Sequence, residues 1–288
     1  MAAIDPRYVA ARRVLLDALE ALAAHKQAVI VAGAQAVYLR TGEGEIGIAP
    51  YTTDGDIAID PATLQDEPQL EAAMRAAHFA PSLTEPGEWL GTTTVDGEAS
   101  TISIDLIVPE GVAPPGGRRG ARLGPHGNRA ARRAVGLEAA LVDHSPMTVT
   151  ALEPSDAREF EVEVAGVAAL FVAKAHKIHD RLESNRPGRA EDKDAADVYR
   201  LMQTTSPNDV AARLGELREH ETAGPVTEAA IGYLVELFGR RNGDGVQMAV
   251  RALQLAIPEA QVATLATDFI NRLTAALGEG DDDLNSAG

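Results

Sequence analysis

The sequence predicts an α+β protein in which a mixed α/β half, residues 1–165, is followed by an all-helical region, residues 166–278. Two observations carry this prediction. In the first half, short apolar runs bounded by glycine, proline and aspartate alternate with helical patterns. From Val167 onward, apolar residues recur at helical spacing almost to the end of the chain. The last segment, residues 279–288, consists of acidic and small residues, and we expect a disordered tail there.

The elements of the first half have local signals. Asp5 followed by Pro6 is typical of a helix N-terminus, so the chain should open with a helix. Asp96 and Gly97 stand between two strand-like runs and predict a β-hairpin. Strands are predicted over residues 28–33, 54–60, 89–95, 100–109, 147–153 and 159–166, and further helices over residues 34–40 and 66–77 and from about residue 128.

The composition is that of an ordinary globular protein of 288 residues, with 45% hydrophobic and 24% charged residues. No apolar run approaches the roughly 18–20 residues that span a bilayer, so we expect no association with a membrane. Charges interrupt the N-terminal apolar stretch, which argues against a signal peptide. The chain has no cysteine, which excludes disulfides and thiolate chemistry and is compatible with a cytoplasmic location.

The charge of the chain is acidic and unevenly distributed. It has 43 Asp and Glu residues against 26 Lys and Arg residues, a net charge of −17, so the protein as a whole should repel nucleic acid. Residues 111–137, however, contain no acid and carry six arginines. These are Arg118, Arg119, Arg122, Arg129, Arg132 and Arg133. A basic segment on an acidic protein predicts a local site for an anionic partner.

Three aspartates fall in strand-like runs, where aspartate is disfavoured. Asp54 and Asp56 are two residues apart, so in a strand their side chains point to one face, about 7 Å apart. Asp105 stands among isoleucine and leucine in the run 100–109. If the two strands are neighbours, three carboxylates converge, and their repulsion requires a raised pKa or divalent cations. Mg²⁺ or Mn²⁺ suits such oxygen ligands, and a solvated strand end is the alternative.

Two further features are suited to anions. Gly33 and Ala34 join a buried strand to a helix, whose first N–H groups can bind phosphate oxygens. In a later helix, the spacing of Lys174, Lys177 and Arg181 places the three cations on one face. The alternative for this second feature is a cationic face exposed to solvent.

Together, the glycine at a strand-to-helix turn, the Asp-x-Asp pair and the third aspartate on an apolar strand resemble the DNA polymerase β nucleotidyltransferase superfamily. The segments "AKAHKIHDR" and "DKDAADVYRL" narrow the resemblance to the AbiEii/MenT-type nucleotidyltransferase toxins, in which a Lys-x-His helix precedes a Lys/Arg-Asp-x-x-Asp helix. The resemblance covers residues 28–202. It implies a polymerase β-like core with a mixed sheet, followed by a helical region.

The resemblance also implies roles for individual residues. Asp54, Asp56 and Asp105 would be catalytic and would bind the metal. Lys177 would be catalytic by contacting the triphosphate, and Asp197 would match a catalytic acid of the last motif. The residues expected to bind the nucleotide are Gly33, Ala34, Thr52, Lys174 and Lys177.

The implied function is an Mg²⁺-dependent transfer of a nucleotide from an NTP, with release of pyrophosphate. Family members modify the 3′ end of tRNA and inhibit growth, so a tRNA acceptor and a cognate antitoxin protein are the expected partners. Arg118, Arg119 and Arg122 follow the strand of Asp105 and are expected to bind that RNA. Two alternatives remain: a small-molecule acceptor, as in aminoglycoside nucleotidyltransferases, and a non-catalytic nucleotide-binding module.

Overall fold

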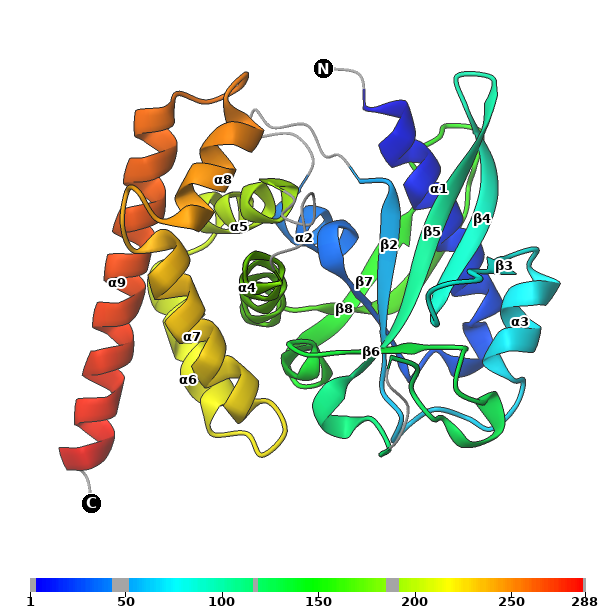
Figure 1. Cartoon of the computed structure of the whole chain (residues 1–288), viewed down its shortest axis with the longest axis horizontal. Helices are drawn as coiled ribbons and strands as arrows, with labels where there is room; N and C mark the ends of the chain where they lie inside the picture. Colours follow the sequence, from blue (N-terminus) through cyan, green and yellow to red (C-terminus); the bar gives the residue numbers. More distant parts are fainter. Residues whose placement is uncertain (1–3, 43–51, 116–118, 185–191, 287–288) are drawn as a thin grey trace.

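The structure, a computed structural model, describes residues 4–42, 52–115, 119–184 and 192–286, and for residues 279–286 it describes the backbone alone. Figure 1 shows a half built around a sheet and a half built of helices, lying side by side. The predicted α+β class, with a mixed sheet in the first half and helices in the second, is confirmed.

Within the described residues, eight strands form one mixed sheet in the order β3-β4-β5-β2-β1-β8-β7, with β6 paired to β5. The strands are β1 (Val29–Ala32), β2 (Asp54–Ile59), β3 (Ala80–Pro81), β4 (Glu88–Val95), β5 (Glu98–Pro109), β6 (Arg132–Ala134), β7 (His144–Thr150) and β8 (Glu159–Ala165). β2 runs parallel to β5, whereas β1 runs antiparallel to β2 and parallel to β8. The predicted hairpin is confirmed, because β4 and β5 pair antiparallel from Val95 and Glu98 onward.

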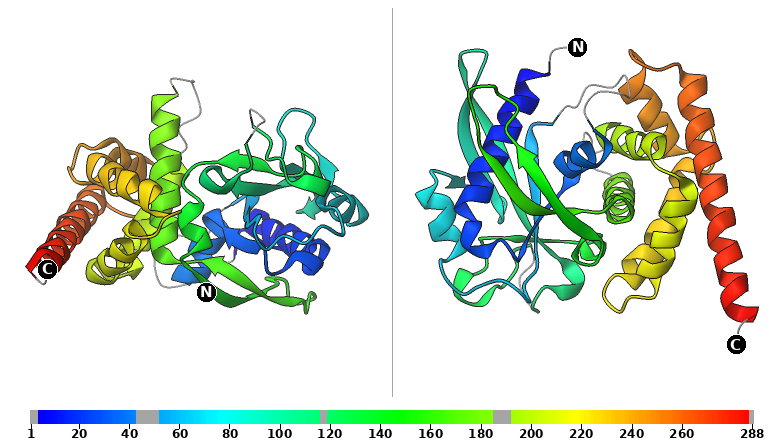
Figure 2. Two further views of the ribbon diagram at one scale, coloured as in Figure 1. Left: turned by 90° about the horizontal axis from the view of Figure 1, so that it is seen from below. Right: turned by 180° about the vertical axis from the view of Figure 1, so that it is seen from behind.

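The two faces of the sheet have different neighbours. α1 (Pro6–Ala21), capped by the Asp5 side chain, lies across one face, as Figure 2 shows. On β5, Ile104 and Leu106 are fully buried, and Asp105 between them points to the opposite face. α2 (Gly33–Thr41) and α4 (Val167–Glu183) lie side by side between the sheet and the C-terminal helices.

The helical region begins directly after β8, with α4 at Val167. After α4 its helices are α5 (Asp192–Thr204), α6 (Pro207–Arg218), α7 (Gly224–Phe238), α8 (Asp244–Leu253) and α9 (Glu259–Ser286). One hydrophobic cluster extends from Tyr8 in α1 to Leu277 in α9, so the two halves share a core. In the part of the chain that the structure describes, no helix is long and apolar enough to cross a membrane.

Several predicted elements differ in the structure; the strand predicted over residues 147–153, for example, is β7 at His144–Thr150. The helix predicted from about residue 128 is wrong: the backbone of Arg132–Ala134 pairs with β5 as β6, and this pairing overrides the local helical signal. The helix predicted over residues 66–77 is shorter, since α3 spans Leu70–Ala76. The α9 backbone continues to Ser286, into the segment where the sequence predicts a disordered tail, because each added residue gains a hydrogen bond once a helix exists.

Trp89 provides a test of how β6 is held. Its buried indole on β4 donates a hydrogen bond to the Ala130 carbonyl, 2.9 Å away and two residues before β6. Trp89→Phe keeps an aromatic ring but leaves this buried carbonyl without its donor, so the free energy of unfolding should fall by about 1–3 kcal/mol. Urea unfolding followed by circular dichroism measures the change. Leu83→Ala, at a site 93% exposed, is the control and should shift it by less than about 0.5 kcal/mol. Equal shifts in the two variants would contradict the prediction.

Candidate active site

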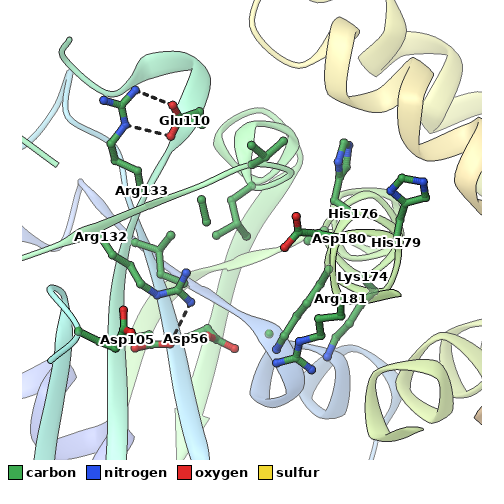
Figure 3. A pocket seen from close by; sticks show the side chains of 18 of the residues that line it. Asp56, Asp105, Glu110, Arg132, Arg133, Lys174, His176, His179, Asp180 and Arg181 are labelled. Carbon is green, nitrogen blue, oxygen red and sulfur yellow. Dashed lines mark hydrogen bonds and ion pairs between the residues drawn. The ribbon is translucent and has the colours of Figure 1, made fainter. Parts of the chain in front are cut away.

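Two aspartates of the sheet stand directly opposite each other. In the parallel pair of β2 and β5, Asp56 is the register partner of Asp105, and Asp54 is the partner of Ser103. Register partners on neighbouring strands lie about 5 Å apart with their side chains on one face. The sequence left open whether the strand of Asp105 lies beside the strand of Asp54 and Asp56, and the structure shows that it does. Figure 3 shows Asp56 and Asp105 side by side on one wall of a cleft.

The carboxylate of Asp56 lies against the turn from β1 into α2. Ala32, the last residue of β1, is the register partner of Asp56, and Gly33 follows with a φ of +62°. A Cβ on Gly33 would lie 1.9 Å from Asp56 Oδ2, so only glycine allows this approach. The predicted order of strand, glycine and helix is confirmed. Ala34 follows in the first turn of α2 and is buried.

Asp54 is bound by groups outside the Asp56–Asp105 pair. Its Oδ1 accepts a hydrogen bond from the Thr52 hydroxyl and lies 3.4 Å from Lys193 Nζ. Lys193 Nζ also donates to Thr52 Oγ1 over 2.7 Å. Burial favours the neutral carboxyl, but the charge of Lys193 and the hydrogen bond from Thr52 outweigh burial and lower the pKa of Asp54. Because Lys193 belongs to α5, these contacts join the helical region to β2.

Asp105 forms an ion pair with Arg132 of β6, whose Nη2 donates to Oδ2 over 2.9 Å. Burial raises the pKa of Asp105; Arg132 opposes this shift and the charge of Asp56 adds to it. The resulting pKa of Asp105 lies above its ordinary value. Arg132 therefore neutralises the carboxylate pair only in part.

The three cations of α4 converge on Asp194 of α5. Lys174 is buried and donates to Asp194 over 2.7 Å and to Asp197 over 2.6 Å. Burial opposes the charge of this ammonium, but Asp194 and Asp197 outweigh burial and raise the pKa of Lys174 above its ordinary value. Lys177 Nζ lies 3.4 Å from Asp194 Oδ1 with its side chain 34% exposed, and Arg181 also pairs with Asp194. Of the two lysines, Lys177 is the one whose ammonium can reach a ligand.

A cleft of about 820 Å³ separates the carboxylate pair from α4. Figure 3 shows Asp56, Asp105, Arg132 and Arg133 on the sheet side of the cleft and the side chains of α4 on the other. Of the predicted site residues, those that line the cleft are Gly33, Asp56, Asp105, Lys174 and Lys177. Those that do not are Ala34, Thr52, Asp54 and Asp197. The cleft thus contains a carboxylate pair on one wall and cations on both walls.

The arginines of the segment 111–137 that line the cleft are not the ones expected to bind RNA. Arg118 lies outside the described residues. Arg119 forms an ion pair with Glu85 at the surface, and Arg122 is exposed and does not line the cleft. The arginines of this segment that line the cleft are Arg132 and Arg133.

The donor set fits a divalent cation held by two carboxylates. Among the described residues, no three His, Cys, Asp or Glu side chains are grouped so that they could hold a metal ion, and Asp54 pairs with Lys193. Mg²⁺ is commonly held by one or two carboxylates together with substrate phosphates. Asp56 and Asp105 supply that number on adjacent strands.

Two residues that contact the predicted carboxylates were not predicted from the sequence. Arg132 contacts Asp105 across 27 residues of sequence, and Lys193 contacts Asp54 across 139. No local pattern connects residues so far apart. The sequence offered one indication for each residue: Arg132 lies in the arginine-rich segment, and Lys193 lies in the "DKDAADVYRL" motif.

The two lysines of α4 should differ in their contribution to stability. Lys174→Met removes the buried cation that Asp194 and Asp197 share. Asp194 keeps Lys177 and Arg181, but two buried ion pairs are lost, so the free energy of unfolding should fall by about 3–5 kcal/mol. Lys177 lies one turn further along α4 and is partly exposed. Lys177→Met is therefore the matched control and should lower the free energy of unfolding by less than about 1 kcal/mol. Urea unfolding distinguishes the two. A small effect of both substitutions would show that the buried ion pairs do not hold α4 against α5.

No family model and no curated protein matches the sequence. Among solved structures, the chain is similar to the crystal structure of JHP933 from Helicobacter pylori, with 12% sequence identity and a TM-score of 0.49 over 99% of each chain.

Proposed function

We propose that this protein is a divalent-metal-dependent nucleotidyltransferase, which transfers a nucleotide from an NTP to an acceptor and releases pyrophosphate. The observation that carries the proposal is the pairing of Asp56 with Asp105, beside the glycine that starts α2 and across a cleft from Lys177. Paired carboxylates suit a metal, and the N–H groups at the start of a helix suit phosphate oxygens. Both features lie within one cleft of a size that suits a nucleotide.

The residues of the cleft would divide the work as follows. Asp56 and Asp105 hold Mg²⁺, which when bound stabilises the charge that develops on the phosphoryl oxygens. Lys177 and Arg181 neutralise the triphosphate from the α4 side. The acceptor hydroxyl bonds to the α-phosphorus, the bond from that phosphorus to the β-phosphate bridging oxygen breaks, and pyrophosphate leaves. The carboxylate of Asp105, which lines the same cleft, would receive the hydroxyl proton.

The acceptor we propose is the 3′ end of an RNA, tRNA in the first place, because the sequence resembles the AbiEii/MenT-type toxins. The same resemblance supports a cytoplasmic toxin with a cognate antitoxin protein. Arg133 supplies a further cation in the lining of the cleft, where an RNA end would enter.

One observation favours a non-catalytic nucleotide-binding module instead. Asp105 and Asp54 are each paired with a cation of the protein, Arg132 and Lys193, and a permanently neutralised site would not need a metal. Labelled NTPs separate the possibilities. Label in RNA supports the proposal, label in a small-molecule fraction indicates a small acceptor, and label that is bound but never transferred indicates the non-catalytic module.

Asp56→Asn tests the metal site. The substitution removes a metal ligand, so incorporation of label from the four NTPs into total RNA in the presence of Mg²⁺ should fall by more than about a hundredfold. Without metal, the free energy of unfolding should hold or rise, because one of two neighbouring like charges is lost. Glu110→Gln removes a carboxylate from the same cleft, one that pairs with Arg133, and is the control. A folded Asp56→Asn variant with full activity would remove the proposed site.

Lys177→Ala tests the triphosphate contact. Loss of a hydrogen bond to a charged group costs about 1.5–3 kcal/mol, so NTP binding should weaken roughly ten- to a hundredfold. Lys26→Ala, an exposed lysine outside the lining of the cleft, is the control and should leave NTP binding unchanged. Equilibrium binding of a non-hydrolysable NTP measures both. Equal affinities of the two variants would assign Lys177 to the solvent-exposed cationic face that the sequence also allows.

A further inference from the structure

Arg132 reaches the carboxylate pair because of the way β6 joins the sheet. β6 pairs with β5 beyond Glu88, the first residue of β4, and Arg132 is the register partner of Ile107. Ile107 stands two residues after Asp105, so the side chains of Arg132 and Asp105 project from the same face. Asp56, opposite Asp105, shares this face. The guanidinium therefore approaches the two carboxylates along the sheet (Figure 3).

The ion pair with Asp105 uses few of the hydrogen-bond donors of the Arg132 guanidinium. Arg132 Nη2 donates to Asp105 Oδ2, and within the described part of the chain this is the one hydrogen bond that the guanidinium makes. The side chain lines the cleft and is 30% exposed. A guanidinium carries five N–H donors in a planar fork that matches carboxylate and phosphate alike. The other four N–H groups make no hydrogen bond within the described residues.

A metal ion and this guanidinium need the same oxygens. A divalent cation that binds both Asp56 and Asp105 takes up carboxylate oxygens of Asp105, one of which accepts the hydrogen bond from Arg132. The two cations also repel each other. A metal ion on the pair therefore weakens the attraction of Asp105 for the guanidinium, whereas the phosphates of a bound nucleotide attract it.

We propose that Arg132 and a divalent cation compete for the Asp56–Asp105 pair, and that metal binding releases Arg132 to bind the phosphates of the nucleotide. The inference rests on the proposed function and deepens it. It gives Arg132 two successive partners: the carboxylate pair when no metal is bound, and the substrate when the metal is bound. A cation, either Arg132 or the metal, then stands beside the carboxylate pair in both states.

Mn²⁺ binding to the full chain without nucleotide tests the competition. Free Mn²⁺ is measured by electron paramagnetic resonance for the wild type, Arg132→Gln and Arg133→Gln. Arg133 is the matched control because it is the next residue, lines the same cleft, and binds Glu110 rather than the carboxylate pair. Arg132→Gln should bind Mn²⁺ about tenfold more tightly than the wild type, whereas Arg133→Gln should differ by less than about threefold.

The second half of the inference is tested with Mn²⁺ present at saturation. Arg132→Gln should then bind a non-hydrolysable NTP about tenfold more weakly than the wild type. Opposite changes in metal and nucleotide affinity are not expected from a merely structural arginine. If Arg132→Gln does not fold, as judged by circular dichroism, Arg132→Lys replaces it. Lysine lacks the planar fork of the guanidinium, so the Arg132→Lys variant should also bind Mn²⁺ more tightly than the wild type.

Unchanged or weaker Mn²⁺ binding by the Arg132 variant overturns the inference, and so does an equal gain in the Arg133 variant. If the wild type binds Mn²⁺ and transfers nucleotide while the Arg132 variant binds Mn²⁺ like the wild type, only the competition fails. If no protein binds Mn²⁺ and none transfers nucleotide, the proposed function fails together with the inference.

Discussion

The parallel pairing of β2 with β5 holds the carboxylates of Asp56 and Asp105 side by side on one face of the sheet. Two charges about 5 Å apart repel by about 3 kcal/mol at an effective dielectric near 20. This is a large fraction of the 5–15 kcal/mol by which a typical protein is stable. Backbone hydrogen bonds fix the strands, so the carboxylates cannot separate, and the surroundings must supply positive charge or hydrogen-bond donors.

The fold meets this requirement from three directions. β6 extends the edge of the sheet and brings Arg132 to Asp105, and the turn at Gly33 brings the start of α2 against Asp56. α5 brings Lys193 to Asp54, which draws this third carboxylate away from the pair. The helical region is therefore part of the site, as well as part of the common core.

The buried contacts between α4 and α5 determine which cations remain available in the cleft. Lys174 is held between Asp194 and Asp197, and this ion cluster fixes the two helices against each other. One turn further on, Lys177 is left at the edge of the cluster and lines the cleft. In a protein with a net charge of −17, Lys177 thus stands in a cleft whose lining contains both acidic and basic side chains.

The sequence by itself determined the α+β class, the turn at Gly33 and the cationic face of α4. These follow from periodicity and side-chain chemistry, which act over a few residues. Only the tertiary structure decided that Arg132 forms an ion pair with Asp105, that Lys193 forms one with Asp54, and that Lys174 is the buried lysine. The helical spacing of Lys174 and Lys177 does not show which of the two is buried, because both lie on one face of the helix. Residues far apart in the sequence leave no pattern that shows their contact. Their partners depend on how β6 and α5 pack, which only the folded chain specifies.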